Sequence, residues 1–238
     1  MASLCEDVVL AKNVSKCLDL HLLQGTFFTS KEKHHWPSCE RSNGWSTITL
    51  EQLLSSPQRV SSKQKVSLAL KLSASLLQLK TSQWLTATWS NEAIYFPQTA
   101  KGSVTNEFEI TEPLILQSFS GTTSSNPGQA PERKPRLMFL ELGILLMEIW
   151  NQEPFANFAK AHNAGQDVSE SMRQGLANDW YDNTYQTMTI RYGKVVRTCV
   201  NFAAEYSEGP QPWDDEDLRV LVCAKIIKPL EEECSVFP

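Results

Sequence analysis

The sequence predicts an α+β protein in which α-helices predominate. Residues 61–80 carry apolar side chains at helical spacing, and residues 137–150 are apolar all the way round a helix. Segments rich in β-branched and aromatic residues are short and few. With 238 residues, 41% of them apolar and 21% charged, the composition is that of a globular protein with one large domain or one and a half.

Residues 1–47 are predicted to form a β-hairpin and loop region ahead of the helices. The segment 17–30 reads CLDLHLLQGTFFTS, with Gly25 between two apolar runs, which is typical of a short hairpin. Residues 31–46 hold Lys, His, Pro, Ser, Asn and Gly and predict a loop. The remainder of the chain, 48–238, is predicted to be the helical region.

Two helix starts are marked by capping residues. Thr49 is placed to cap a short helix over 50–56, which a proline closes. Ser61 and Gln64 form a capping-box pattern at the start of a long amphipathic helix that extends to about residue 80. We expect the wide apolar stripe of this long helix to be buried.

The next segments predict short strands and loops. A loop leads into a strand at 93–96, and a second strand is expected at 107–110. Residues 120–136, SGTTSSNPGQAPERKPR, hold three prolines, three basic residues and many turn formers. This segment cannot bury enough apolar surface to order itself, so we expect a flexible loop or an internal linker.

The segment 137–150, LMFLELGILLMEIW, predicts a helix surrounded by other helices. Its two acids, Glu141 and Glu148, would each need a partner, because an unpaired buried carboxylate is costly. A turn containing Pro154 and a polar segment follow.

Two further helices are predicted near the end of the chain. One covers about 192–206. The other starts at 214 or 215, where acids favour a helix N-terminus, and extends to 228, just before Pro229.

Charge and cysteine content exclude several classes of function. The net charge of -5 argues against nucleic acid or an anionic membrane as the main partner. The N-terminus lacks the basic and apolar regions of a signal peptide, and the longest apolar run is too short to span a bilayer. Six scattered cysteines without a CxxC pair favour a reduced, cytoplasmic protein.

No motif for metal binding or catalysis stands out. His34, His35 and Cys39 lack a second half at zinc spacing, and we interpret them as surface residues. His162 is expected on the solvated surface, and the acidic run 214–217 at a helix start. Two tryptophans of the predicted loop are expected to pack against the long helix rather than stack a ligand: Trp84 and Trp89.

Four segments resemble a fungal kinase-like domain of unknown function, a degenerate form of the C-terminal lobe of protein kinases. They read KVSLALKLSASLLQLKTSQWLTATWSNEAIYF (65–96), LELGILLMEIW (140–150), and the closing YGKVVRTCVNF with CAKIIKPLEEE. Domains of this kind usually follow a helical domain of the HeLo or prion-inhibition type. The resemblance implies a kinase-like C-terminal lobe over 48–238, preceded by a short β remnant of an N-terminal lobe over 1–47.

The residues at the kinase positions imply that phosphoryl transfer is absent. We align AIYF (93–96) with the strand that follows the catalytic loop of kinases. In this alignment Thr86, Ala87 and Thr88 stand where kinases carry His, Arg and Asp, and Ala93 stands at the magnesium-binding Asn. Met138 replaces the Asp by which the central helix holds the catalytic loop. Methyl and hydroxyl groups cannot replace a carboxylate as base or metal ligand. We therefore expect no catalytic residue, no metal site and no cofactor.

Three functional hypotheses follow. The first is a non-catalytic, pseudokinase-like interaction or regulatory module in fungal heterokaryon incompatibility or programmed cell death, with a protein or an adjacent helical domain as its partner. The second is a nucleotide-binding or rewired kinase-like enzyme that uses Glu92, Glu107 or Glu109. The third is a helical structural domain of a larger protein. The first is our preferred interpretation.

Overall fold

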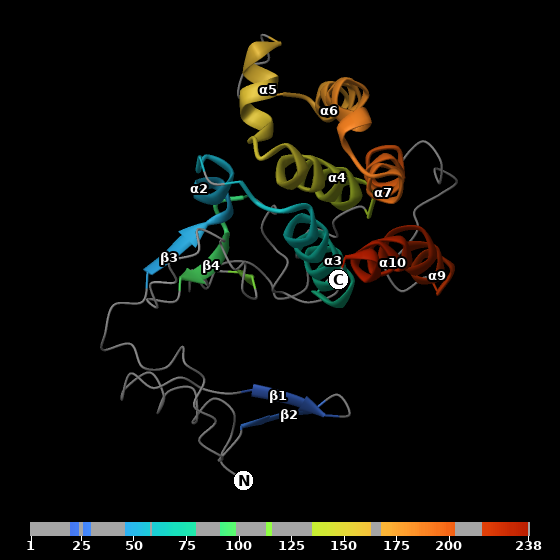
Figure 1. Ribbon diagram of the computed structural model, residues 1–238. Coiled ribbons are helices and arrows are strands. Elements are labelled where there is room, and N and C mark those ends of the chain that lie inside the picture. Colours follow the sequence, from blue (N-terminus) through green and yellow to red (C-terminus); the bar gives the residue numbers. More distant parts are fainter. Residues whose placement is uncertain are drawn as a thin grey trace, which may run out of the picture. The chain divides into compact units, whose positions relative to one another are not determined.

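The computed structural model describes residues 20–23, 26–29, 46–57, 59–79, 91–98, 113–115, 135–162, 168–202 and 216–237 (Figure 1). These segments are predominantly helical, as the sequence predicts. The chain divides into two compact units, residues 1–46 with 99–102 and residues 47–98 with 103–238. The described helices all belong to the second unit.

The first unit contains the hairpin that was predicted for 17–30. Strands β1 (Leu20–Leu23) and β2 (Thr26–Thr29) pair antiparallel, with Leu20 opposite Thr29 and Leu23 opposite Thr26. The loop predicted over 31–46 lies outside the described residues, except that Ser46 begins the next strand.

A small sheet opens the second unit. Its strands are β3 (Ser46–Thr49), β4 (Ile94–Gln98) and β5 (Leu114–Ile115), in the order β3-β4-β5. Strand β4 confirms the strand predicted at 93–96 and pairs antiparallel with β5. The sequence did not predict β3 and β5, because they are too short to show alternation. The strand predicted at 107–110 lies outside the described residues.

The predicted Thr49 cap and the predicted capping box of Ser61 and Gln64 are both present, and the Thr49 cap is also a capping box. At α2 (Leu50–Leu54), the Thr49 hydroxyl accepts from the Gln52 N–H at 3.1 Å, and Gln52 Oε1 accepts from the Thr49 N–H at 2.9 Å. Ser61 and Gln64 exchange the same two bonds at 3.3 and 3.0 Å at the start of α3 (Ser62–Leu79). These bonds satisfy backbone donors that a helix start leaves without partners.

The predicted central helix is α4 (Pro135–Asn151), and it is buried along most of its length. It packs against α3 and against α7 (Ile190–Val200). The helix begins two residues before the predicted position, so the proposed loop over 120–136 is wrong at its last two residues. The reason is that proline is well suited to a first helical turn, where its missing N–H costs nothing.

The polar segment after Pro154 was not predicted to be helical, and this interpretation is wrong. The segment contains two helices, α5 (Phe155–Ala161) and α6 (Glu170–Thr184). Helix α6 buries only Leu176, Ala177 and Trp180, too few apolar side chains to give a clear stripe. A 3₁₀ turn, η3 (Tyr185–Thr187), leads on to α7, which starts two residues before the helix predicted over 192–206.

Pro229 does not end the last helical segment, contrary to our expectation. Helix α9 (Glu216–Val222) continues through a π-helical turn, η4 (Cys223–Ile227), into α10 (Lys228–Val236). In the wide turn the Lys228 N–H donates to the Cys223 carbonyl, five residues earlier. Pro229 then lies in the first turn of α10, where the missing N–H is tolerated.

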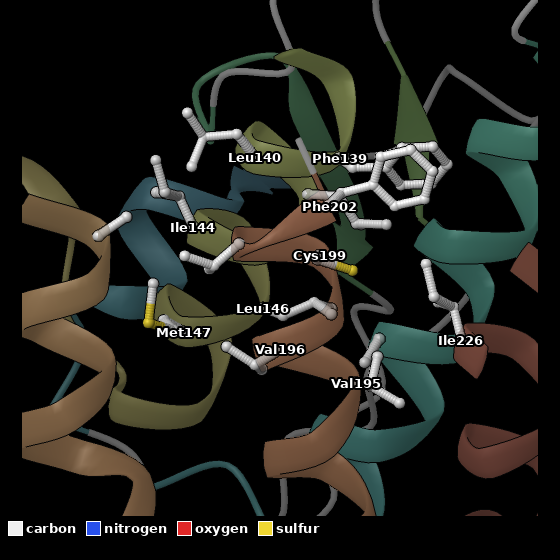
Figure 2. Packing of buried hydrophobic residues seen from close by; sticks show 14 of the residues in the cluster. Phe139, Leu140, Ile144, Leu146, Met147, Val195, Val196, Cys199, Phe202 and Ile226 are labelled. Carbon is white, nitrogen blue, oxygen red and sulfur yellow. The ribbon is translucent and has the colours of Figure 1, made fainter. Parts of the chain in front are cut away.

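Two apolar clusters form the core of the second unit. The larger joins α4, α7 and the C-terminal helices, and includes the stacked rings of Phe139 and Phe202 (Figure 2). The smaller joins α2, α3, β4 and the C-terminal half of α4 around Leu72, Phe96 and Ile149. Among the helices that the structure describes, none has the length and apolar content needed to cross a membrane.

Candidate functional site

A buried carboxylate, that of Glu148, joins three elements near the C-terminal end of α4. Glu148 is only 7% exposed. Its Oε1 accepts hydrogen bonds from the Phe155 backbone N–H at 2.8 Å and from Asn91 Nδ2 at 3.2 Å. Asn91 lies in the turn before β4, and Phe155 begins α5. One oxygen atom therefore ties α4 to the starts of two other elements.

A second acid of α4, Glu141, makes a bidentate ion pair with Arg173 of α6. Arg173 Nε lies 2.6 Å from Glu141 Oε1, and Nη2 lies 2.7 Å from Oε2. The guanidinium also lies 5.0 Å from the centroid of the Phe155 ring. Both side chains are partly exposed, so the pair is less buried than expected. The prediction that each acid of α4 needs a partner is confirmed.

Burial dominates the electrostatics of Glu148. It raises the pKa of the carboxyl group from 4.5 to about 7, while the Phe155 N–H and Arg173 oppose this change. Glu141 and Glu51 raise the pKa further through charge repulsion. Glu148 is therefore poised to change its charge in the physiological pH range.

The C-terminal end of α4 is held by a cation. Lys65 Nζ donates to the Trp150 carbonyl at 2.6 Å and lies 5.6 Å from the Trp150 ring centroid. A positive charge at this end is favourable because the last carbonyls carry partial negative charge. Burial, and then the charge of Arg59, lower the pKa of Lys65.

Gln152, the residue after α4, has a left-handed backbone with a φ of 52°. The Glu153 N–H donates back to the Glu148 carbonyl at 3.3 Å, as in a Schellman motif. Glycine is usual at this position, but Gln152 adds a bond that glycine lacks: its Oε1 accepts from the Val60 N–H at 3.1 Å. These contacts show that the polar groups at this end of α4 connect helices to one another.

Two of the kinase-like positions lie among the described residues. Ala93 is half-buried in the turn before β4, and Met138 is buried in α4. Neither side chain can bind magnesium or act as a general base. The other three positions, 86–88, lie outside the described residues, as do Glu107 and Glu109. Glu92, the third acid of the second hypothesis, is exposed.

The remaining predicted residues lie on the surface where they are described. His162 is exposed at the end of α5, and its ring lies 4.1 Å from that of Phe158. Glu216 and Asp217 occupy the first turn of α9, which confirms a helix-start role for this part of the acidic run. No His, Cys, Asp and Glu side chains of the described segments gather in a set of three that could hold a metal. Several candidates lie outside those segments: His34, His35, Cys39, Trp84, Trp89, Asp214 and Asp215.

One exposed surface combines an apolar side chain with positive charge. Ile190, Lys194 and Arg197 recur at i, i+4 and i+7 on the outer face of α7, and we name these three residues the α7 stripe. Ile190 is 78% exposed, the highest exposure of any large apolar side chain that the structure describes. Within the described part of the chain, neither Lys194 nor Arg197 forms an ion pair.

The α7 stripe is flanked by helices α6 and α10, both of which pack against α7. On the α6 side, Tyr181 stacks on the half-exposed Tyr185 with ring centroids 5.8 Å apart. Burial raises the pKa of Tyr181, and the charge of the nearby Arg197 opposes this. On the α10 side, Arg191 pairs with Glu232 and Glu233. The α7 stripe thus lies between two aromatic rings of the α6 side and the paired Arg191 of the α10 side, and among the described residues its two cations have no acidic partner.

Sequence reasoning missed most of these partners. Nothing in the sequence marks Asn91, Arg173 or Lys65 as a partner of a residue in α4. The useful signal was indirect: an acid inside an apolar helix requires a donor or a cation from elsewhere in the chain. The α7 stripe was also missed, although the spacing of its residues is visible in the sequence.

Comparison with known proteins places the chain in a family. No curated protein and no solved structure matches it. One family model matches residues 1–237, and that family is described as a domain of unknown function, DUF7580. Because the match covers nearly the whole sequence, the chain belongs to the DUF7580 family.

Proposed function

We propose that this chain is a non-catalytic, kinase-like interaction module of the cytoplasm, and that its α7 stripe binds an acidic segment of a protein partner. The partner is a separate protein or an adjacent helical domain of the same polypeptide. Following the resemblance, we place this role in fungal heterokaryon incompatibility or programmed cell death. The observation that carries the binding part of the proposal is the exposure of Ile190 beside two cations that form no ion pair with the residues that the structure describes.

The kinase-like part is supported by the order of elements. A hairpin, a short helix, a long helix, a strand and a buried central helix follow one another as the resemblance implies. The non-catalytic part is supported by Ala93 and Met138, whose side chains cannot perform the roles of the corresponding kinase residues.

The choice of an acidic partner follows from charge. The whole chain has a net charge of -5, yet α7 contains three cations and no acid. Arg191 is already paired with α10, which leaves Lys194 and Arg197 to interact with a partner. Complementary charge of this kind steers and orients association, while an exposed apolar side chain supplies buried area.

The binding test uses a labelled 20-residue helical peptide with leucine at helical spacing and glutamate elsewhere. A matched peptide carries lysine in place of glutamate. We expect fluorescence anisotropy at low salt to show binding of the acidic peptide only. The double variant Lys194→Glu/Arg197→Glu should weaken this binding at least about tenfold.

A control variant with the same change in net charge is Lys160→Glu/Lys225→Glu, at exposed positions of α5 and η4. This control should bind the acidic peptide like the wild type at the same salt concentration. Equal loss of binding in both variants, or equal binding of both peptides, would contradict a specific role for the α7 stripe.

The non-catalytic part is tested by thermal unfolding with and without millimolar Mg-ATP, with EDTA controls. We expect an unchanged midpoint. A ligand at about 100 times its dissociation constant adds about 2.7 kcal/mol, which raises the midpoint by several degrees in a protein of this size. A magnesium-dependent rise would contradict the proposal and support the nucleotide-binding alternative.

A further inference from the structure

Glu148 differs from the other acid of α4 in the kind of partner it has. Its two hydrogen-bond donors, the Phe155 N–H and the Asn91 amide, are both neutral. The nearest cation, Arg173, directs Nε and Nη2 at Glu141. Burial shifts the balance of a carboxyl group toward its protonated form when no cation is bonded directly to it.

The charges that face Glu148 do not compensate for its ionisation. Helix α6 contributes Arg173, α4 contributes Glu141, and α2 contributes Glu51. One cation thus faces two further acids. The remaining neighbours, in the turn before β4 and at the start of α5, contribute only neutral donors. Protonation of Glu148 removes one negative charge from this group.

We infer that Glu148 is a proton-sensitive latch at the junction of α4, α5 and the turn before β4. The protonated side chain keeps the junction closed, because Oε1 still accepts both hydrogen bonds while no charge is buried. Loss of the proton favours local opening, since an open junction lets water solvate the carboxylate.

The pH range over which Glu148 affects the junction follows from the linkage between proton binding and opening. When the junction opens, Glu148 regains its ordinary pKa of 4.5, whereas the closed state holds it at about 7. The contribution of Glu148 to closure is therefore complete below pH 4.5 and is lost progressively as pH rises to about 7. Between these limits the opening equilibrium increases by up to about 300-fold and then becomes constant.

The first measurement is made on the wild-type chain, so that it does not depend on a variant folding. Glutamate is labelled with ¹³C at the carboxyl carbon, and the resonances are followed by NMR from pH 4 to pH 9. We expect one resonance with a midpoint near 7, which is absent in Glu148→Gln. If every glutamate carboxyl titrates below about pH 5.5, the inference is wrong.

The second measurement is hydrogen exchange at the Phe155 amide, corrected for the intrinsic pH dependence of exchange. Exchange should accelerate between pH 4.5 and 7 in the wild type and in Glu153→Gln, a variant of an exposed neighbouring acid. Acceleration that persists in Glu148→Gln would assign the effect to another group and overturn the inference.

Asn91→Ala provides a directional check. The Asn91 amide donates to the carboxylate and so stabilises its ionised form. Its removal should raise the ¹³C midpoint above the wild-type value. His162→Asn, at the other end of α5, serves as a further control and should leave the midpoint unchanged. An unchanged midpoint in Asn91→Ala, or a changed one in His162→Asn, would count against the assignment.

Discussion

Around Gly143, helix α4 packs against α7 through apolar side chains, whereas at Glu148 and Trp150 the same helix is held by hydrogen bonds and charges. A Cβ atom on Gly143 would lie 2.8 Å from Val200 Cγ2 and 3.1 Å from the Val200 backbone nitrogen. The polar end instead binds Asn91, Phe155 and Lys65 through specific donors.

The difference has a physical consequence. The apolar contacts between α4 and α7 around Gly143 depend on side-chain volume, because protein interiors are close-packed and tolerate neither voids nor extra atoms. Contacts at the polar end depend on protonation and on the pairing of charges, because desolvated groups lose their hydration. We therefore expect the two regions of α4 to respond to different substitutions, and only the polar end to respond to pH.

The largest effect is expected for Phe139→Ala. Phe139 is fully buried, and its ring stacks on Phe202 with centroids 4.1 Å apart. Removal of a buried aromatic ring leaves a cavity and should lower the free energy of unfolding by about 3–5 kcal/mol in urea denaturation. Met172→Ala, at a half-exposed position, should change it by less than about 0.5 kcal/mol. A decrease in the free energy of unfolding of less than about 1 kcal/mol for Phe139→Ala would contradict dense packing between α4 and α7.

An intermediate effect is expected for Gly143→Ala. The added methyl group meets Val200 and should destabilise the protein by about 1–3 kcal/mol. Gly175→Ala in α6 is a matched control, because a Cβ there meets no atom within 4 Å. That control should increase stability by about 0.5–1 kcal/mol, since alanine favours helices over glycine. Equal effects at the two glycines would show that the close approach at Gly143 is absent.

The smallest effect is expected at the polar end, for the pair Glu141–Arg173. A double-mutant cycle with Glu141→Gln and Arg173→Met should give a coupling energy of about 1 kcal/mol, because both side chains are partly exposed. The more exposed pair Arg136–Glu170 should give about 0.3 kcal/mol in the same experiment. If the two cycles give the same value, burial does not strengthen the pair at α4.

Predictions from the sequence were most accurate where local chemistry decides the structure. Thr49 with Gln52, and Ser61 with Gln64, mark helix starts because each cap is made within four residues. The all-round apolar pattern of α4 predicted its central position. Prediction failed for α6, because its few buried residues include Trp180, which packs against the rings of Phe155 and Phe158 in α5.

The candidate sites were harder to predict from the sequence than the fold was. Glu148 was recognised as a residue in need of a partner, but its partners lie 57 and 7 residues away and are neutral donors. No spacing rule connects such groups, because their meeting depends on how three elements pack. The α7 stripe required knowledge of which face of that helix α4 covers.

The sequence by itself determined the helical character, the helix caps at Thr49 and Ser61, the hairpin and the central place of α4, because these depend on residues close together in the chain. Only the tertiary structure decided which donors surround Glu148, where Arg173 finds its acid, and which face of α7 stays exposed. Those features depend on contacts between distant segments, whose burial sets both the cost of a charge and the identity of its partner.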